Sequence, residues 1–262
     1  MILLLKAFLL GIVEGATEFL PVSSTGHLIV ASEMLGYPEA ARATFEIFIQ
    51  LGAILAVFWH YRAPLLDLAA RLPSDGRARA LVLKVALAFL PAAFVGFLCH
   101  DWIEENLFSV RAVAWALIVG GVILLVVERR ERKPLVDEME GMRWSDAFWV
   151  GIAQVASLYP GVSRAGATIV GGLLAGLGRP AATQFSFYLA LPTITAASLF
   201  SLLKSLGDLT PSDAAPLAVG FVTAFASALI VIRGFIRYVQ SHDFRVFGWY
   251  RIVAGALLLA MM

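Results

Sequence analysis

The chain gathers its densest polar chemistry in Glu14-Gly-Ala-Thr-Glu-Phe-Leu-Pro-Val-Ser-Ser-Thr-Gly-His27. These residues include two carboxylates, four hydroxyls and one imidazole, although apolar sequence flanks them on both sides. Ionisable groups inside a hydrocarbon-like segment are costly and usually mark a functional site. Pro21, followed by Ser-Ser-Thr-Gly, also interrupts any continuous helix. We therefore expect two half-helices that meet at a turn within a membrane, with Ser23 or Ser24 capping the second half.

The composition around this stretch is typical of a helical membrane protein. The 262 residues are 60% hydrophobic and 15% charged, whereas soluble domains are roughly half apolar and about a quarter charged. Long apolar runs alternate with short charged loops, as in chains that cross a bilayer several times. The net charge of +1 indicates no nucleic-acid partner, and the single Cys99 allows neither a disulfide framework nor a thiolate metal site. We expect an all-α, multi-pass membrane protein.

Six apolar runs are candidates to span the membrane as continuous helices. They are Ala43–Trp59, Leu81–Leu98, Ala112–Val127, Phe185–Leu203, Ala214–Ile232 and Phe247–Met262. A second broken unit lies between them, in which Tyr159–Thr168 interrupts apolar sequence on either side.

The two broken units are related by an internal repeat. A shift of 140 residues places Gly11–Val30 on Gly151–Val170 without gaps, and eight of the twenty pairs are identical. The sequence therefore predicts one integral membrane domain, residues 1–262. It consists of repeat 1 at about 1–127, a polar loop at about 128–146 and repeat 2 at about 147–262. Each repeat holds one re-entrant broken-helix hairpin followed by three transmembrane helices.

The charges of the loops predict that the two repeats have inverted topology. Lys and Arg are concentrated at 61–80, 128–143 and 233–245, while the connections 99–111 and 204–213 hold one basic residue each. The positive-inside rule makes the first group cytoplasmic. The first hairpin then enters from outside and the second from inside, which places a polar site where the hairpins meet near the midplane. We expect this site to open to the periplasm. It would bring together Glu14, Glu18, Ser24 and His27 with Ser163, Arg164 and Thr168.

Glu14 and Glu18 are four residues apart and share one face of a helix. Two carboxylates this close repel each other unless a cation lies between them. Oxygen ligands of this kind suit a divalent metal, and we expect Mg²⁺, with Ca²⁺ as the alternative. The other interpretation is that both Glu residues pair with Arg164 and only stabilise the fold.

Ser23, Ser24, Thr25 and His27 place hydroxyls beside a base. A hydroxyl next to an imidazole or carboxylate is a minimal activated nucleophile. The alternative is structural: the serines would cap a half-helix and His27 would satisfy a buried carbonyl. For Ser23, which recurs as Ser163, capping and function are equally supported by the sequence.

The second broken unit predicts a site for phosphate. Gly161 lies in a turn before a helix, and Ser163, Arg164 and Thr168 follow it. Backbone N–H groups at such a turn bind phosphate oxygens, and arginine adds a bidentate positive charge. The alternative is a tight turn with Arg164 as counter-ion to the Glu pair. Together the hairpins predict phosphoryl transfer or phosphoanhydride hydrolysis on a lipid-linked phosphate.

Four motifs occur along the chain: Glu14-x-x-x-Glu18 with Phe-Leu-Pro-Val-Ser-Ser-Thr-Gly-His27, then Ile49-Gln-Leu-Gly-Ala-Ile-Leu-Ala, Pro160-Gly-Val-Ser-Arg-x-Gly-Ala-Thr168 and Gly248-Trp-Tyr-Arg-Ile-Val253. With these motifs the chain closely resembles the bacitracin-resistance-type undecaprenyl-diphosphate phosphatases over essentially its whole length. The resemblance implies a hydrolase of the bacterial plasma (inner) membrane. Its reaction would convert undecaprenyl diphosphate to undecaprenyl phosphate, the lipid carrier of cell-wall (peptidoglycan) synthesis. It also implies a divalent metal and an effect on bacitracin resistance.

The resemblance also implies roles for individual residues. Glu14 and Glu18 match the family's acidic pair, used for metal binding or acid–base work. Ser24 and His27 match its proposed nucleophile and base, and Arg164 matches its diphosphate-binding arginine. Ser163 and Thr168 match polar residues of the second motif, and we group Gly161 and Ser23 with them as substrate-binding. Ala165 departs from the pattern, since the family usually has a second serine there.

A flippase or transporter of polyprenyl phosphate lipids is the alternative from another functional class. Inverted repeats with broken helices are also the architecture of alternating access. A transport site needs Arg164 and hydroxyls, but has little use for two Glu residues and His27 beside Ser24. The sequence therefore favours an enzyme. It leaves the oligomeric state open, with a homodimer as one alternative.

Overall fold

The computed structural model describes residues 1–107, 109–129, 133–205 and 211–262. The regular elements of these residues are helices, as the sequence predicts. The α-helices are α1 (Ile2–Thr17), α2 (Ser24–Leu35), α3 (Glu39–His60), α4 (Arg62–Arg71), α5 (Gly76–Leu107), α6 (Val110–Arg129), α7 (Trp144–Val155), α8 (Arg164–Leu174), α9 (Arg179–Ser205), α10 (Ala214–Val239) and α11 (Arg245–Ala260). Short 3-10 turns lie at Met139–Gly141, Ala156–Leu158 and Pro211–Asp213.

Five helical segments of the described chain are long and apolar enough to cross a bilayer. They are Ala41–His60, Gly76–Cys99, Val110–Arg129, Arg179–Lys204 and Pro211–Val239. Each overlaps a run predicted to span, so the prediction of a multi-pass helical membrane protein is confirmed. The sixth predicted span, Phe247–Met262, corresponds to α11, whose 16 residues fall short of the length of about 20 that a perpendicular crossing needs.

The charged segment 61–80 is more ordered than a loop, because it contains α4. Arg71 forms ion pairs with Asp67 and Asp75, each four residues away, at 2.9 and 3.1 Å. Asp67 and Arg71 lie on one side of α4 and support the helix, whereas Asp75 lies beyond its last residue. The charged composition of residues 61–80 predicted a loop, and it gave no sign of α4.

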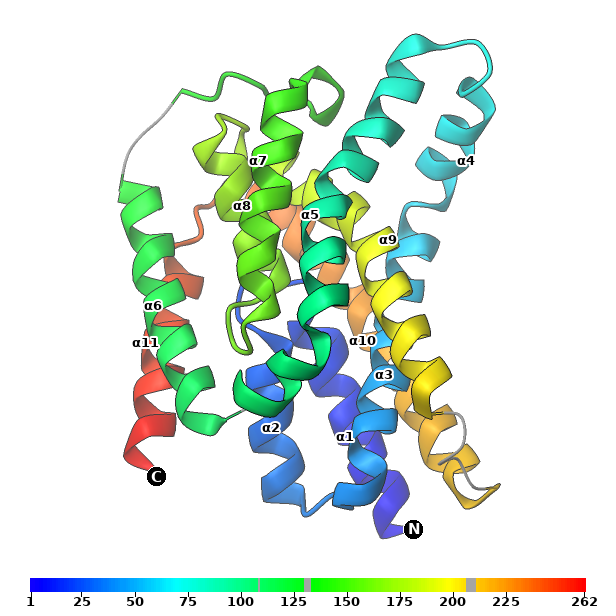
Figure 1. Cartoon of the computed structure of the whole chain (residues 1–262), viewed down its shortest axis with the longest axis vertical. Helices are drawn as coiled ribbons and strands as arrows, with labels where there is room; N and C mark the ends of the chain where they lie inside the picture. The colour runs from blue at the N-terminus through cyan, green and yellow to red at the C-terminus, as the bar shows by residue number, and fades with distance from the viewer. Residues whose placement is uncertain (108, 130–132, 206–210) are drawn as a thin grey trace.

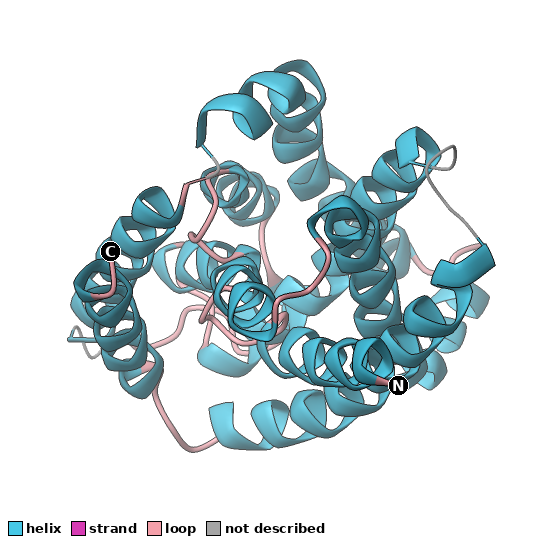
Figure 2. Cartoon of the chain, turned by 90° about the horizontal axis from the view of Figure 1, so that it is seen from below, coloured by secondary structure: helices cyan, strands magenta, loops and turns pink. Residues whose placement is uncertain are grey.

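Both predicted broken units occur as pairs of short helices. α1 ends at Thr17 and α2 begins at Ser24, while α7 and its 3-10 extension end at Leu158 and α8 begins at Arg164. In Figure 1, α1 and α2 occupy the lower half of the molecule and α7 and α8 the upper half. The two turns between the short helices lie between these halves. Seen from below, the helices surround centrally placed loops (Figure 2).

The helix pairings are reciprocal between the two parts of the chain. α1 packs against α10 and α7 packs against α5, while α3 contacts α9 and α6 contacts α11. Small residues make the first two pairings close. A Cβ on Gly11 would lie 2.5 Å from the Gly220 carbonyl oxygen, and a Cβ on Gly151 would lie 2.6 Å from that of Ala88. Gly11 and Gly151 are equivalent in the 140-residue repeat, so the same sequence position serves the same packing role twice.

Candidate active site

Each turn ends in a serine with the same unusual backbone. Ser23 has φ 72° and Ser163 has φ 71°, and they are the only non-glycine residues with positive φ in the described chain. Such a conformation costs on the order of 1–3 kcal/mol and is concentrated at functional sites. Each side chain caps the helix that follows, since Ser23 Oγ accepts from Gly26 N at 3.4 Å and Ser163 Oγ accepts from Gly166 N at 3.1 Å. The capping interpretation of Ser23 therefore has a structural basis.

The two turns are in direct contact. Ser163 Oγ donates to the Leu20 carbonyl oxygen at 3.4 Å. Gly161, at φ 92°, passes close to α6, where a Cβ would lie 2.8 Å from the Val113 carbonyl oxygen. A residue with a side chain would be excluded there by both strain and space. The N-termini of α2 and α8 thus converge, and both carry partial positive charge from the helix dipole.

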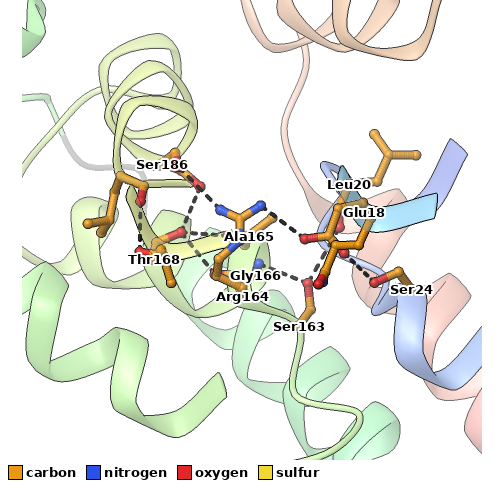
Figure 3. Close-up of polar contacts among 12 residues, drawn as sticks. Glu18, Leu20, Ser24, Ser163, Arg164, Ala165, Gly166, Thr168 and Ser186 are labelled. Atoms are coloured by element: carbon orange, nitrogen blue, oxygen red, sulfur yellow. Dashed lines mark hydrogen bonds and ion pairs between the residues drawn. The ribbon is translucent and has the colours of Figure 1, made fainter. Parts of the chain in front are cut away.

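Glu18 links the two turns through its carboxylate. Its Oε2 accepts a hydrogen bond from Ser24 Oγ at 2.5 Å. Its Oε1 accepts one from Arg164 Nη2 at 3.3 Å. Figure 3 shows these three side chains pointing toward one another across the two turns. Both charged partners are buried, with side-chain exposures of 6% for Glu18 and 9% for Arg164. The structure therefore brings together an acid, a hydroxyl and a cation from distant parts of the sequence.

Arg164 is held in place by α9 and by an aromatic ring. Nη1 donates to the Ser186 carbonyl oxygen at 3.2 Å, and the guanidinium lies over the Phe19 ring at 5.8 Å. Its buried Nε–H has no hydrogen-bond partner within the described chain. An unpaired buried donor on a cation is expected where an anion binds. This donor leaves Arg164 able to contact a phosphate oxygen.

Thr168 and Ala165 face the protein interior. Thr168 Oγ1 donates to the Arg164 carbonyl oxygen at 2.9 Å and shares a 2.7 Å hydrogen bond with Ser186 Oγ. Both Thr168 and Ala165 are fully buried. The structure thus uses the Thr168 hydroxyl to join α8 to α9. A serine at position 165 would place its hydroxyl in the apolar core around Ala165.

His27 does not contact Ser24 in this structure. Its Nδ1 lies 2.7 Å from the Ser23 carbonyl oxygen and its Nε2 lies 2.5 Å from the Tyr250 hydroxyl. The planes of the His27 and Tyr250 rings are nearly parallel, with an angle of 4° between them. The sequence placed a hydroxyl beside an imidazole or a carboxylate, and the structure pairs Ser24 with the carboxylate.

Glu14 supplies the observation that bears on a metal. Its side chain is 1% exposed, and its Oε1 is a buried acceptor without a hydrogen-bond partner in the described chain. Glu14 lies in α1 and Glu18 is the residue that caps its C-terminus with helical backbone angles, so the two carboxylates lie on one side of the helix. The described residues contain no cluster of three or more His, Cys, Asp or Glu that could form a complete metal cage. Mg²⁺ commonly binds through one or two carboxylates completed by water and substrate phosphate oxygens, so the residues present fit a metal of that kind.

Ser186 was not part of any motif in the sequence, whereas Tyr250 and Arg251 lie in the motif Gly248-Trp-Tyr-Arg-Ile-Val253 but were given no role from it. Ser186 accepts a hydrogen bond from Arg164 through its carbonyl oxygen and shares another with Thr168 through its hydroxyl. The Tyr250 hydroxyl contacts His27. Arg251 is buried, with 2% exposure, and donates to backbone carbonyls of both turns. Arg251 lies in a predicted membrane span, and an ionisable residue there is by itself a sign of a functional position. Ser186 gave no such sign, because a lone serine in an apolar helix is unremarkable.

Sequence comparisons agree with the motifs. A family model described as "Bacitracin resistance protein BacA" matches residues 7–257. Undecaprenyl-diphosphatase 2 of Rhodospirillum rubrum is 51% identical over 261 residues, which cover 99% of this chain and 95% of the relative. The undecaprenyl-diphosphatases of Laribacter hongkongensis and Nitrosomonas eutropha are each 50% identical over 258 residues, 98% of this chain and 94% of each relative. The chain therefore belongs to the family of the bacitracin resistance protein BacA, as its two hairpin motifs predict.

Proposed function

We propose that this protein hydrolyses undecaprenyl diphosphate to undecaprenyl phosphate and inorganic phosphate. The observation that carries the proposal is the array of Ser24, Glu18 and Arg164 at two converging helix N-termini. It combines a hydroxyl held by a base with an anion-binding site, which is what phosphoanhydride cleavage requires. The names of the relatives support the substrate and the reaction. The flippase alternative gains no specific support from these contacts.

The geometry favours Ser24 over His27 as the nucleophile. Ser24 Oγ lies 2.5 Å from a carboxylate oxygen of Glu18, whereas both ring nitrogens of His27 are already bound. In the first step Ser24 Oγ attacks the terminal phosphorus and its proton passes to Glu18. The bond from that phosphorus to the bridging oxygen breaks, and undecaprenyl phosphate leaves with the electron pair.

In the second step water attacks the phosphorus of phosphoserine. The bond from phosphorus to Ser24 Oγ breaks, and the Glu18 proton returns to Ser24. The protons of water remain with the released phosphate. During both steps Arg164 binds phosphate oxygens, which replace the long 3.3 Å contact to Glu18. The N–H groups at the start of α2 and α8 face the same negative charge.

We further propose that Glu14 and Glu18 hold Mg²⁺ when substrate is bound, with Ca²⁺ as a substitute. The metal would neutralise charge on the diphosphate. The orphaned Oε1 of Glu14 supports this assignment. Exposure to a chelator should then stop phosphate release, and added Mg²⁺ should restore it.

The direct test is phosphate release from a polyprenyl diphosphate by purified protein with Mg²⁺. We expect Glu18→Gln and Arg164→Ala each to lower kcat by at least about 100-fold, the typical loss on removing one catalytic group. Glu33→Gln, which changes an exposed carboxylate on α2, is the matched control and should keep full activity. Full activity in both site variants would refute the proposed reaction.

A trapping experiment distinguishes the two nucleophiles. Acid quenching during turnover with a terminally labelled substrate should leave label on the peptide that contains Ser24. Phosphoserine survives acid, whereas phosphohistidine is hydrolysed by acid and survives alkali. Label that is stable only in alkali would assign the nucleophile to His27 instead.

We also propose that the two halves are inverted repeats with re-entrant hairpins, in the bacterial inner membrane, with the site open to the periplasm. The reciprocal helix pairings and the opposite positions of the hairpins in Figure 1 support this topology. In a Cys99→Ala background, an impermeant maleimide added to whole spheroplasts should label Glu39→Cys but not Glu138→Cys. The released lipid would then return to cell-wall synthesis, and overproduction should raise bacitracin resistance.

A further inference from the structure

Arg251 is a buried cation whose hydrogen bonds all go to backbone carbonyl oxygens. It lies on α11 with 2% exposure, and a guanidinium has five N–H donors. All five are used. Nη1 donates to Pro21 and Val162 at 3.2 and 2.9 Å, Nη2 to Ala116 and Gly161 at 3.1 and 3.2 Å, and Nε to Leu117 at 3.4 Å.

These carbonyls come from three separate parts of the chain. Pro21 belongs to the first turn, and Gly161 and Val162 belong to the second. The remaining two acceptors lie in α6. One side chain therefore fixes both turns to each other and to a helix outside the hairpins. Apart from those of Arg251, the side-chain hydrogen bonds between the two hairpins in the described chain are the 3.4 Å bond from Ser163 to Leu20 and the ion-paired bond from Arg164 to Glu18.

The position of Arg251 also fixes the direction of a backbone donor in the second turn. In a trans peptide the carbonyl and the following N–H point in opposite directions. Binding of the Val162 carbonyl by Arg251 therefore turns the Ser163 N–H away from the guanidinium. This N–H is at the start of α8, and in the described chain it meets no acceptor. A free N–H at a helix N-terminus is a donor for an anion.

Two glycines leave the space that the Arg251 guanidinium occupies. A Cβ on Gly120 would overlap Nη2 of Arg251, and a Cβ on Gly166 would lie 3.0 Å from Nη1. Lysine at position 251 would keep the charge but has only three donors on one nitrogen, so it cannot bind all five carbonyls.

We propose that Arg251 is a positioning residue that holds the acidic turn and the phosphate-binding turn in the relative geometry needed for the reaction. It touches none of Glu18, Ser24 or Arg164 through a hydrogen bond, and it acts on them through the backbone of their turns. This inference rests on the proposed phosphatase function. A misplacement of about 1 Å between reacting groups can cost on the order of 100-fold in rate.

The test compares Arg251→Lys with Arg245→Lys, a matched change on the same helix. Arg245 binds Asp243 and the Glu128 carbonyl at the far end of α11, away from both turns. We expect Arg251→Lys to lower kcat by about 100-fold. KM should change much less, because Arg164 still binds the diphosphate. Arg245→Lys should keep the activity of the unmodified protein.

Hydrogen exchange separates positioning from general destabilisation. In Arg251→Lys, peptides covering residues 19–24 and 159–165 should both exchange faster, while peptides from α3, α9 and α10 should not. Arg245→Lys should leave both turn peptides unchanged. Unchanged exchange in the turns, or a uniform increase over all helices, would overturn the proposal. This readout needs no substrate, so it also stands if the unmodified protein releases no phosphate and the proposed function fails.

A second variant keeps the test decisive if Arg251→Lys does not fold. Gly120→Ala displaces the guanidinium without removing it and should reproduce both the loss of kcat and the faster exchange of the two turns. Gly234→Ala is its control, because a Cβ there meets nothing within 4 Å. Normal activity and normal exchange in Gly120→Ala would contradict the role of Arg251.

Discussion

His27 is bound at both ring nitrogens, and its partners define its protonation. The Ser23 carbonyl can only accept a hydrogen bond, so Nδ1 carries the proton. In the neutral ring Nε2 then accepts from the Tyr250 hydroxyl. The basic nitrogen is therefore covered by a phenol. Any proton transfer to His27 must involve the Tyr250 hydroxyl or displace it.

Tyr250→Phe tests whether this contact matters to the reaction. We expect a loss of activity that disappears when His27 is already Ala, because Tyr250 acts through the imidazole. The coupling in such a double-mutant cycle should be about 0.5–3 kcal/mol. Nitrogen NMR of His27 should show a single Nδ1–H tautomer, held by the Ser23 carbonyl, and the Nε2 signal should shift in Tyr250→Phe because that nitrogen loses its hydrogen bond. Tyr238→Phe removes a comparable hydroxyl contact, to the Asp243 carbonyl, and is the control. Additive losses would place Tyr250 outside the function of His27.

For single residues, the sequence predicted which side chains lie close together, but not which of them form hydrogen bonds with each other. The repeat and the loop charges predicted that Glu18 and Ser24 would lie opposite Arg164, and the structure places these three in one array. The partner of Ser24 was left open between imidazole and carboxylate. That choice depends on side-chain rotamers and on Tyr250, more than 220 residues further along the chain. The residues next to Ser24 in the sequence therefore do not determine its hydrogen-bond partner.

At the scale of helices, the contact between α7 and α5 depends on a missing side chain. A Cβ on Gly151 would lie 2.6 Å from the Ala88 carbonyl oxygen and 2.7 Å from its Cα. Neither backbone atom can move aside easily, and membrane helices approach closely only where residues are small. We expect Gly151→Ala to lower stability by about 1–3 kcal/mol. Thermal unfolding in detergent measures this loss, and Gly234→Ala should show no such fall. Equal midpoints for the two variants would contradict the close packing.

The junction between α4 and α5 should respond to acid. The backbone N–H of Arg77 donates to Asp75 Oδ1 at 2.8 Å, and this bond, with the nearby Arg71 charge, lowers the pKa of Asp75 despite partial desolvation. A lowered folded-state pKa gives stability that is present at neutral pH and is lost as the pH falls through that pKa. We expect Asp75→Asn to lower the unfolding midpoint by about 1–3 °C at pH 7. The difference should shrink below pH of about 3.8, the ordinary pKa of aspartate. A difference independent of pH would exclude the carboxylate charge as its cause.

Element types were predictable because long apolar runs have few alternatives to a membrane helix. Five of the six predicted spans occur as helices that are long and apolar enough to cross a bilayer. α4 was missed because its apolar face is short: Leu68 is buried in the core and Leu65 packs against it, while Arg71 forms ion pairs with Asp67 and Asp75. α11 has the predicted length but begins and ends two residues earlier, at Arg245 and Ala260, so its 16 residues remain short for a perpendicular crossing.

At the scale of the whole molecule, neither half can complete its packing alone. α1 of the first half packs on α10 of the second, and α7 of the second packs on α5 of the first. The carbonyls bound by Arg251 also come from both halves. We expect two fragments separated within residues 133–146 to restore phosphate release when produced together. Each fragment alone should be inactive and unstable in detergent. Activity in one isolated half would contradict this interdependence.

Both chain ends lie at the same end of the molecule in Figure 1, opposite the loop that joins the halves. This arrangement makes the protein a candidate for circular permutation. A linker could join Met262 to Met1, and new ends could be opened in the loop before α7. Each half would still begin and end on its original side of the bilayer, so the order of the halves would change without reversing any helix. We therefore expect the order in which the two halves are synthesised to affect the folding pathway but not the folded structure.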